Sequence, residues 1–410
     1  MDALTITSCD ATAVPREAGP PAPARAVSCG GLSAAILKEP AEITAIAAQW
    51  RALEARVTQP VFFQSHAWCS HVLRNGAGDP AQDGIAPRIV CVHQAGELVG
   101  LWPLRLMHQM GARLLTDLSD PYGQYADALI APEADAAAVF QSMLAVIRQA
   151  GETDGLLLHK VRADAALAPF LAHHGKRAGD SERAPFIRLA DHTSFEAFHL
   201  TVNPKTRKNL RNNRNRLARV GEVMHEVVVD PATRRQVINR AFDLRLELLE
   251  DRGHTSRAYN DPAFRNFVAA LADDASGDLE LLVMALSLQG RDLAIQWGFV
   301  HNGRYYAYVA ARSTFHEDAS PGRLHLAHVL ATCMARGIAV ADLLAPAAPY
   351  KLSWTSDATP IADWTLALTW RGRMVLDLWD KRLRPTARAV LLNLPLAVRR
   401  PLVRLMRRTG

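Results

Sequence analysis

The spacing of apolar residues along the first part of the chain changes from a helical period to an alternating one. Residues 41–57 place four apolar side chains on one face at helical spacing: Ile43, Ile46, Trp50 and Leu53. A second helix is predicted with Ser65 as its N-cap. Residues 88–106 then alternate, which predicts two strands joined by a turn around Ala95 and Gly96.

The same order of elements recurs later in the chain. A strand is predicted at residues 154–161, between helices near 134–149 and 165–173. In the second half, helices are predicted at residues 203–220, 231–251, 262–272 and 320–337, and a strand at 338–344. Residues 279–312 predict three antiparallel strands with Gly-containing turns. We therefore expect two similarly built α+β domains that are joined within residues 180–195.

Length and cysteine usage agree with two intracellular domains. A chain of 410 residues exceeds the roughly 250 residues at which a single core stops growing. The five cysteines are odd in number and form no CxxC pair, so neither a disulfide framework nor a zinc knuckle is indicated. We expect a cytoplasmic protein without a metal site.

Composition shifts suggest where these domains begin and end. Residues 1–32 are rich in proline and lack the apolar run of a signal peptide, so we expect a disordered leader. Two domains follow, at 33–185 and 190–370. Residues 371–410 form a basic tail that mixes Leu and Val with many arginines. No run of about eighteen apolar residues occurs, so no membrane span is predicted.

The most basic stretch of the chain is residues 203–221, with seven Lys and Arg and no acid between Lys205 and Arg219. Its pattern predicts one amphipathic helix with Asn203 as N-cap and a narrow apolar stripe of Leu210, Leu217 and Val220. It has almost no aromatic side chains to stack on bases, which disfavours a nucleic-acid site. We expect Lys208 and Arg211 to face a cleft and hold an anionic substrate, with a solvated surface as the alternative.

A second candidate anion site is the start of the helix at 320–337. Ser320 is placed as N-cap, and Pro321 presets the first helical position. Gly322 leaves the backbone N–H groups of the first turn open to a phosphate. The expected buried stripe is Leu324, Ala327, Leu330, Ala331 and Met334. A capped helix that binds nothing is the alternative, and a solvated face is preferred over a metal pair for His325 and His328.

Six segments in this order resemble one family. They are ELVGLWPLRL, SDPYGQYADALI, NPKTRKNLRNNRNRLARVG, DRG after a long helix, the SPG helix start and DLLAPAAPYKLSWT. Together they resemble the CelD-like and FemAB-like branch of the GNAT superfamily over roughly residues 40–370. The resemblance implies an α+β fold of two tandem GNAT-like domains, each a mixed, mostly antiparallel sheet flanked by helices. It also implies an acyl-CoA-dependent N-acyltransferase with its donor site in the second domain.

The resemblance also implies roles for particular residues. Backbone from Ala319 to Leu324 would cradle the pyrophosphate of acyl-CoA or acetyl-CoA. The expected donor-binding residues are Arg312, Ser320, Pro321, Gly322, Arg323 and Leu324. For catalysis we expect Tyr350 as a proton donor, Lys351 as the cation for an oxyanion, Asp342 to orient it or act as base, and His316 as an alternative base. The remaining substrate-binding candidates are Asp120, Tyr122, Tyr125 and His254.

Three questions about partners stay open at this stage. The donor can be acyl-CoA, an acyl carrier protein or, as in some FemAB-like relatives, aminoacyl-tRNA. The acceptor can be a small or a lipidic amine of cell-envelope lipid or polysaccharide metabolism. The tail at 371–410 can lie on the inner face of an anionic membrane or pack over the second domain. A scaffold that has lost catalysis and assists envelope biosynthesis is a further alternative.

Overall fold

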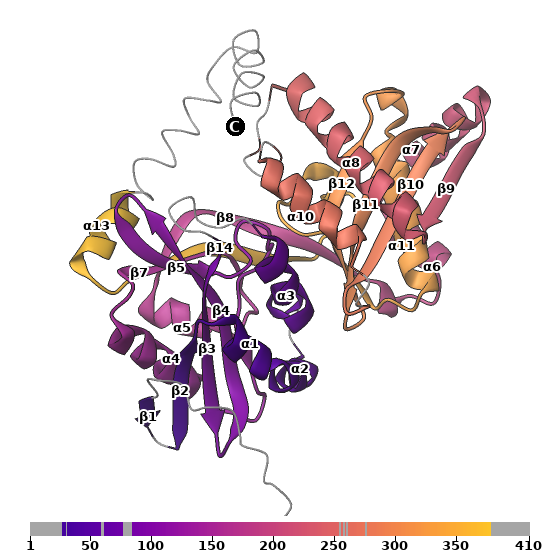
Figure 1. The fold of residues 1–410 in the computed structure, drawn as a ribbon. Coiled ribbons are helices and arrows are strands. Elements are labelled where there is room, and N and C mark those ends of the chain that lie inside the picture. Colours follow the sequence, from indigo (N-terminus) through magenta and orange to yellow (C-terminus); the bar gives the residue numbers. More distant parts are fainter. Residues whose placement is uncertain are drawn as a thin grey trace, which may run out of the picture.

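A computed structural model describes residues 27–29, 31–58, 61–76, 84–253, 256, 259, 261–274 and 277–378 (Figure 1). Their strands form one long sheet in the order β1-β2-β3-β4-β5-β7-β14-β8-β13-β12-β11-β10-β9, with β6 paired to β4. Neighbouring strands are antiparallel except for the parallel pairs β5–β7 and β12–β13. Helices flank both halves of this mixed sheet, which confirms the predicted α+β fold class.

The first half contains the elements before residue 188. Its strands are β1 (Val27–Cys29), β2 (Leu32–Leu37), β3 (Ala86–Gln94), β4 (Glu97–Gln109), β5 (Ala112–Asp117), β6 (Leu129–Ile130), β7 (Gly155–Arg162) and β8 (Lys176–Arg188). Its helices are α1 (Pro40–Ala45), α2 (Ala47–Arg56), η1 (Phe62–Gln64), α3 (His66–Asn75), α4 (Ala136–Ala150) and α5 (Leu167–His174). As predicted, Ser65 caps α3 by accepting the Trp68 N–H, and Ala95 and Gly96 form the β3–β4 turn with positive φ.

The second half contains the remaining elements. Its helices are η2 (Leu189–Asp191), α6 (Phe195–Thr201), α7 (Pro204–Val220), α8 (Pro231–Asp251), α10 (Pro262–Ala272), η3 (Glu317–Ala319), α11 (Pro321–Ala335), α12 (Pro349–Leu352) and α13 (Trp370–Leu378). Its strands are β9 (Val223–Val228), β10 (Glu280–Leu288), β11 (Arg291–His301), β12 (Arg304–Arg312), β13 (Val340–Asp342) and β14 (Ala358–Ala367). None of the described helices has the length and apolar character needed to cross a membrane.

Helices cover both faces of the second half's sheet. On one face, Val283 and Ile295 pack with Phe242 of α8 in the same core that fills the first half. On the other face, Met284 and Tyr305 pack against α11 in a separate core. The alternation of neighbours such as Val283 and Met284 between the two cores is the period-2 pattern of a strand buried on both sides.

Aromatic stacking joins the two halves beside the sheet. The ring of Phe62 in η1 stacks on Phe299 of β11 with centroids 4.6 Å apart. Trp68 of α3 meets Phe267 of α10 edge to face at 5.5 Å. His301 of β11 lies 2.8 Å from a carboxylate oxygen of Glu54 in α2. These contacts, all from buried or half-buried side chains, hold the halves together apart from the sheet itself.

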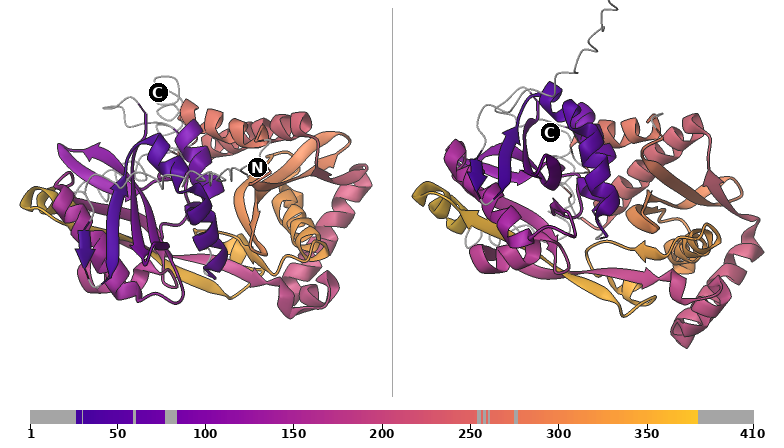
Figure 2. Two further views of the ribbon diagram at one scale, coloured as in Figure 1. Left: turned by 60° about the horizontal axis from the view of Figure 1, so that its bottom comes forward. Right: turned by 90° about the horizontal axis from the view of Figure 1, so that it is seen from below.

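Two strands run across the junction, as the views in Figures 1 and 2 show. β8 pairs with β14 over most of its length and with β13 at its last residues, Phe186 to Arg188. β14 follows the whole second half in sequence, yet it lies between β7 and β8. The junction expected within residues 180–195 therefore includes strand, and the last strand of the chain belongs to the sheet next to β7.

Several sequence predictions need correction. The helix predicted at 41–57 is broken at Ile46, and the strand predicted at 338–344 keeps only three residues. Val27–Cys29 forms a strand, so the predicted leader of residues 1–32 extends too far; residues 1–26 lie outside the described part of the chain. In α7, Val220 is exposed, and Thr206 is buried with Leu210 and Leu217 instead. In α11, the buried side is His325, Leu326, Val329, Leu330 and Cys333, so only Leu330 of the predicted stripe is buried.

Candidate active site

The two strands β12 and β13 separate at the centre of the molecule. They pair in parallel only from Arg304–Val340 to Tyr306–Asp342. β13 ends at Asp342, whereas β12 continues to Arg312. Beyond Asp342, the edge of β12 is therefore not covered by β13. The 119–127 segment of the first half reaches this place, because Tyr308 of β12 donates a 2.7 Å hydrogen bond to the carbonyl oxygen of Tyr122.

Asp342, a predicted catalytic residue, is fully buried at this point. Its Oδ1 atom accepts hydrogen bonds from the hydroxyl of Tyr125 at 2.9 Å and the backbone N–H of Leu344 at 3.0 Å. Its Oδ2 atom accepts from Arg162 at 3.0 Å and from Arg304 at 3.3 Å. Donors from both halves of the chain thus occupy both oxygens of this carboxylate.

Lys351 of α12 is linked to this carboxylate through Leu344, and Tyr350 precedes Lys351 in the same helix. The Nζ atom of Lys351 donates to the carbonyl oxygen of Leu344 at 2.9 Å, and the residue is only 8% exposed. Burial lowers the pKa of Lys351 to about 8, against the opposing charge of Asp342. Burial also raises the pKa of the half-buried Tyr350 hydroxyl. A lysine that titrates near pH 8 can serve in either protonation state near neutrality.

Lys160, at the end of β7, was not among the sequence candidates. Its backbone has φ 54°, and its N–H donates to Asp363 of β14 at 2.9 Å. The Nζ atom donates to the side-chain oxygen of Gln124 at 2.9 Å, and burial lowers its pKa. Arg162, two residues on, was missed as well. The signal available in the sequence was the segment HKVR, whose basic residues follow the apolar GLLL at the end of the strand.

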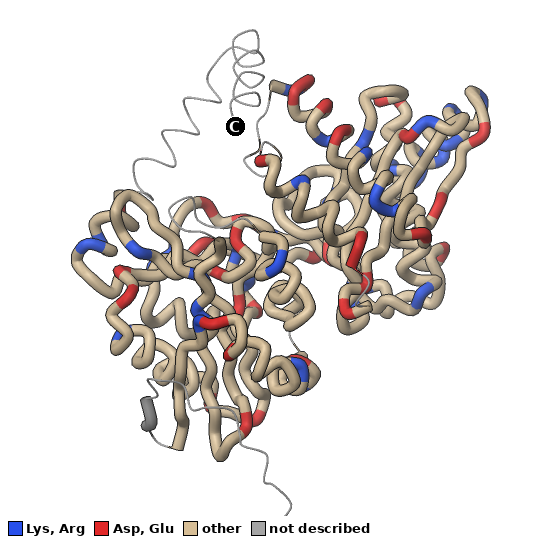
Figure 3. The backbone as a smooth tube through the Cα atoms, viewed as in Figure 1, with Lys and Arg blue, Asp and Glu red and all other residues tan. Residues whose placement is uncertain are grey.

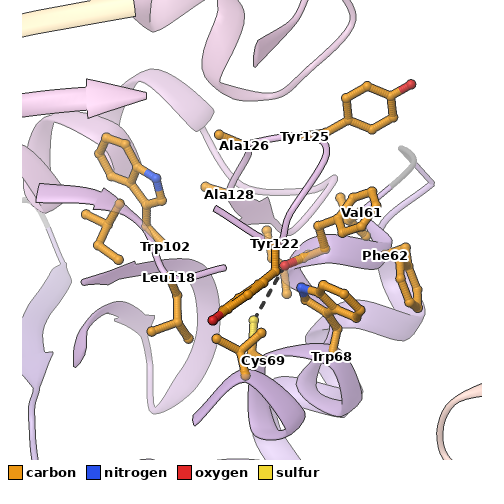
Figure 4. Packing of buried hydrophobic residues seen from close by; sticks show 14 of the residues in the cluster. Val61, Phe62, Trp68, Cys69, Trp102, Leu118, Tyr122, Tyr125, Ala126 and Ala128 are labelled. Atoms are coloured by element: carbon orange, nitrogen blue, oxygen red, sulfur yellow. Dashed lines mark hydrogen bonds between the residues drawn. The ribbon is translucent and has the colours of Figure 1, made fainter. Parts of the chain in front are cut away.

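The tyrosines predicted to bind substrate have different surroundings. Tyr122 is 1% exposed and stacks on Phe267 with centroids 4.0 Å apart, so it has a packing role. In Figure 4 it lies among Trp68 and Cys69, whereas the ring of Tyr125 points away from this cluster. The Tyr125 ring faces Arg162, whose guanidinium carbon is 4.9 Å from the ring centroid. Asp120 is half-buried and accepts from Arg105 through its backbone carbonyl.

The predicted donor-binding residues lie at the start of α11. Ser320 occupies the N-cap position with φ 47°, but its side chain makes no capping hydrogen bond, which corrects the expected cap. Pro321 is buried at the first helical position as predicted. A Cβ atom at Gly322 would lie 3.4 Å from Cδ of Arg312, which is an ordinary van der Waals contact. The Arg312 guanidinium is already paired with the carboxylate of Glu317.

Of the two remaining histidine candidates, the structure describes only His316. His316 is half-buried, with its ring 4.2 Å from that of Phe315, and it belongs to the segment before α11. His254 lies outside the described residues. The structure thus brings Asp342, Lys351 and Tyr125 together at the junction, and it places Tyr350 next to Lys351 in α12 and His316 in the segment before α11.

A groove of about 900 Å³ lies between α7 and α11, over β9 and β10. Its lining is Phe195, Glu196, His199, Leu200, Pro204, Arg207, Lys208, Leu210, Arg211, Arg214, Leu217, Val223, His225, Leu286, Leu324, Ala327, His328 and Ala331. The predicted residues Lys208 and Arg211 thus face a groove, with Leu324 of the first turn of α11 also in its wall. Figure 3 shows the blue cations of α7 on the side of the second half that faces away from the first.

The four groove-lining cations of α7 are Arg207, Lys208, Arg211 and Arg214. Within the described residues, none of them has a carboxylate partner; the neighbouring Arg216, which does not line the groove, is paired with Asp318 at 2.7 Å. The groove therefore has a cationic wall on α7 and an apolar floor.

Three histidines lie together next to the groove. The ring of His328 stacks on His225 at 4.1 Å, and His325 lies 6.2 Å from His225. His325 is 1% exposed and donates from Nε2 to the carbonyl oxygen of Met284, so the expected solvated face is wrong for this residue. Burial lowers its pKa to about 3. No group of three or more His, Cys, Asp or Glu among the described residues is arranged to hold a metal ion.

Comparison with known proteins was made for sequence and for structure. Residues 204–352 match the family model of the acetyltransferase (GNAT) domain. This range contains α7, the groove, the start of α11, Asp342 and Lys351. A search of curated protein sequences gave no significant match.

Two solved structures share the fold, and a third is reported as similar. FemX is 12% identical, and the match covers 75% of this chain and 97% of that one with a TM-score of 0.54. A conserved protein of unknown function from Bacteroides thetaiotaomicron is also 12% identical, over 78% and 97%, with a TM-score of 0.51. A tandem GNAT protein from the clavulanic acid biosynthesis pathway is 15% identical over 82% and 98%, with a TM-score of 0.48.

Proposed function

We propose that the protein is an N-acyltransferase that uses acyl-CoA or acetyl-CoA, starting from the match of residues 204–352 to the model of the acetyltransferase (GNAT) domain. The observation that carries the proposal is the position of Lys351, buried beside Asp342 where β12 and β13 separate. A buried cation next to an uncovered strand edge is suited to an acyl group whose carbonyl oxygen gains negative charge during reaction.

The reaction has simple requirements. The neutral amine attacks the thioester carbonyl, a C–N bond forms, the C–S bond breaks, and the leaving thiolate takes up a proton. Lys351, in its charged form, stabilises the oxyanion, and the hydroxyl of Tyr350 supplies the proton to the thiolate. The proton that the amine nitrogen loses on forming the amide restores the Tyr350 hydroxyl. Asp342 is a positioning residue, because its two oxygens are already occupied by Tyr125, Arg162 and Leu344.

The anionic end of the donor would be held on the α11 side. In the first turn of α11, the N–H of Arg323 already donates to the carbonyl oxygen of Ser320 at 3.0 Å, which leaves the backbone N–H of Gly322 for an anion. Leu324 of this turn also lines the groove, whose α7 wall supplies Lys208 and Arg211. This arrangement supports a donor with several phosphates. One phosphate could bind at the start of α11, and the next could reach the cations of α7.

Acyl transfer can be tested directly with the purified full chain. Acetyl-CoA and longer acyl-CoAs are offered with a panel of amines, and free thiol and the N-acyl product are both measured. We expect product with at least one pair and a loss of about 100-fold or more in kcat for Lys351→Met. Lys176→Met, which alters an exposed lysine paired with Asp377, serves as the control. Absence of transfer with every pair would favour a catalytically inactive accessory protein.

An aminoacyl-tRNA donor is the second candidate function. It is favoured by the cations of α7 that have no carboxylate partner among the described residues, and an open cationic surface also suits an RNA backbone. Two measurements distinguish these donors: the salt dependence of binding and the thermal shift that each donor produces. Tight RNA binding that weakens steeply with salt, together with no stabilisation by acyl-CoA, would replace the acyl-CoA proposal.

Contact with a membrane surface is part of the proposal. On α13, the side chains of Trp370 and Met374 lie one turn apart and are 76% and 64% exposed. The basic tail follows directly in the sequence, although residues 379–410 lie outside the described part of the chain. Exposed apolar side chains next to many arginines suit an anionic lipid surface. We therefore favour an acceptor of cell-envelope metabolism, used at the inner face of the membrane.

A further inference from the structure

Gln64, the last residue of η1, is a polar side chain without exposed surface in the core of the first half. Its amide nitrogen donates two hydrogen bonds, to the backbone carbonyl oxygen of Tyr125 at 2.8 Å and to Oδ2 of Asp117 at 3.2 Å. Among the described residues, its side-chain oxygen Oε1 has no hydrogen-bond partner. A buried acceptor without a partner costs free energy, so a glutamine here calls for a use of its two N–H groups.

The backbone that carries this amide is itself fixed. The indole N–H of Trp50 donates to the carbonyl oxygen of Gln64 at 3.0 Å. The preceding residue, Phe63, meets the ring of Tyr125 edge to face, with centroids 5.9 Å apart. η1 therefore contacts Tyr125 twice, at its backbone through Gln64 and at its ring through Phe63.

Asp117 connects Gln64 to the start of the loop that carries Tyr125. It is the last residue of β5, and its Oδ1 atom accepts from the backbone N–H of Ser119 at 3.0 Å and from the Ser119 hydroxyl at 2.5 Å. A Cβ atom at Gly123 would lie 2.1 Å from the Ser119 hydroxyl oxygen, so the loop turns tightly at this point. Gln64 thus bridges the beginning of the loop and Tyr125.

From Tyr125 the contacts continue to the candidate active site. The Tyr125 hydroxyl donates to Oδ1 of Asp342 at 2.9 Å, and the same oxygen accepts the N–H of Leu344 at 3.0 Å. The carbonyl oxygen of Leu344 accepts from Nζ of Lys351 at 2.9 Å. A series of hydrogen bonds, joined by single residues, therefore leads from Gln64 in the first half to Lys351 in the second.

We propose that Gln64 is a positioning residue of the candidate active site: it holds the backbone of Tyr125 so that the Tyr125 hydroxyl stays on Asp342. The inference rests on the proposed acyl transfer. Because Gln64 has no exposed surface, it acts through Tyr125 and not on a substrate. A displacement of about 1 Å can lower a rate by about 100-fold, so a loosened Tyr125 should be felt in the chemical step.

The test replaces Gln64 with Met, a flexible side chain of similar length that has no N–H to donate. We expect kcat to fall by about five- to tenfold, while KM for the amine and for the acyl-CoA changes by less than about twofold. Thr153→Val is the control. Thr153 is also buried in the first half, and its hydroxyl hydrogen-bonds to the carbonyl oxygens of Arg113 and Gly155. This variant should change kcat by less than about twofold.

A double-mutant cycle with Tyr125→Phe separates positioning from general damage. If Gln64 acts through the Tyr125 hydroxyl, Gln64→Met with Tyr125→Phe should lose no more than about twofold in kcat beyond Tyr125→Phe alone. Thr153→Val with Tyr125→Phe should instead show the product of the two single losses, because independent sites are additive in free energy. If Gln64→Met does not fold, Gln64→Asn, which draws the amide back by one methylene, takes its place in the cycle.

An unchanged kcat in Gln64→Met, or losses that multiply when it is combined with Tyr125→Phe, would overturn the inference. If the wild type acylates no amine, the proposed function has failed, and the same cycle is measured by urea unfolding. A destabilisation of the double variant that is smaller than the sum of the single destabilisations would support the link between Gln64 and Tyr125 on its own. Destabilisations that add would remove it.

Discussion

The hydroxyl of Tyr125 donates a 2.9 Å hydrogen bond to Oδ1 of Asp342, although 217 positions separate the two residues in sequence. Tyr125 belongs to a loop of the first half, and Asp342 ends β13 in the second. The fully buried carboxylate at the centre of the candidate site is therefore oriented by both halves, and neither half alone would hold it in this geometry.

Tyr125→Phe removes this hydrogen bond and leaves the ring in place. We expect the free energy of unfolding to fall by about 1–2 kcal/mol, because the lost bond has a charged acceptor. We also expect kcat to fall by about tenfold, because Asp342 loses one of its orienting donors. Urea unfolding and acyl-transfer kinetics measure the two effects.

Tyr305→Phe is the matched control for Tyr125→Phe, since Tyr305 is also fully buried but packs on the α11 side of the sheet. It should lower stability without a specific loss of kcat. Equal losses of kcat in the two variants would contradict the positioning role of Tyr125.

Lys351 gives the reaction an alkaline limit. Its pKa of about 8 means that the charged form is lost as the pH rises through this value, so activity should fall with a midpoint near pH 8. Lys351→Arg should keep its charge and shift the alkaline fall in activity to higher pH. A wild-type rate that keeps rising to pH 10 would indicate that Lys351 acts as the neutral base instead.

The same lysine also costs stability. Its folded pKa lies below the value of about 10.4 in an unfolded chain, so the unfolded state binds the proton more tightly, and this penalty is full below about pH 8 and disappears as the pH rises toward 10.4. Lys351→Met should therefore raise the free energy of unfolding at pH 7, by about 1–3 kcal/mol. Denaturant unfolding at pH 7 and pH 10 measures it, and a destabilised variant at pH 7 would contradict the expectation.

How much of this could be predicted from the sequence depends on how local the signal is. The bounds of α8 and α10 agree with the prediction, because Asp and Pro mark each start and the apolar period continues to each end. β8 was missed: most of its residues are exposed and polar, and its strand conformation depends on pairing with β13 and β14. β14 was missed because it contains Pro360 and an irregular register near Asp363.

The residues of the candidate site also differ in how local their sequence signal is. Asp342, Tyr350 and Lys351 are close in sequence, so one motif indicated all three. Arg162 comes from β7, which meets Asp342 only after folding, and no spacing in the sequence connects the two.

Charge reversal on α7 tests the groove. Lys208→Glu with Arg211→Glu should weaken acyl-CoA binding by about tenfold or more, because both side chains line the groove. Lys205→Glu with Arg219→Glu makes the same change in net charge on the same helix outside the groove and should have little effect. Calorimetry at two salt concentrations measures both. If the two double variants weaken acyl-CoA binding equally, α7 contributes only general surface charge and not a specific binding site.

His325 makes the protein sensitive to acid. Its folded pKa of about 3 lies below the unfolded value of 6.5, so its contribution to stability is full above pH 6.5 and is lost as the pH falls toward 3. The loss amounts to about 1.4 kcal/mol for each pH unit in this window. His325→Gln, which can still donate to Met284, should flatten the curve between pH 6.5 and 4. Identical curves for the two proteins would contradict this.

The surface of α13 can be tested with vesicles that contain anionic lipid. Trp370→Glu with Met374→Glu should reduce co-sedimentation, because both changes place acids on the exposed apolar face. Val229→Glu, at an equally exposed apolar residue of the second half, is the control. Deletion of residues 379–410 should abolish sedimentation, and unchanged sedimentation in both variants would remove the membrane proposal.

The position of β14 has a consequence for biosynthesis. Its ten residues, Ala358–Ala367, fill the place between β7 and β8. While the ribosome is still translating the second half, the first half has a gap in its sheet and two unpaired strand edges. Completion of its sheet therefore has to wait until β14 has been made, and a fragment that stops before β14 would expose those edges to aggregation.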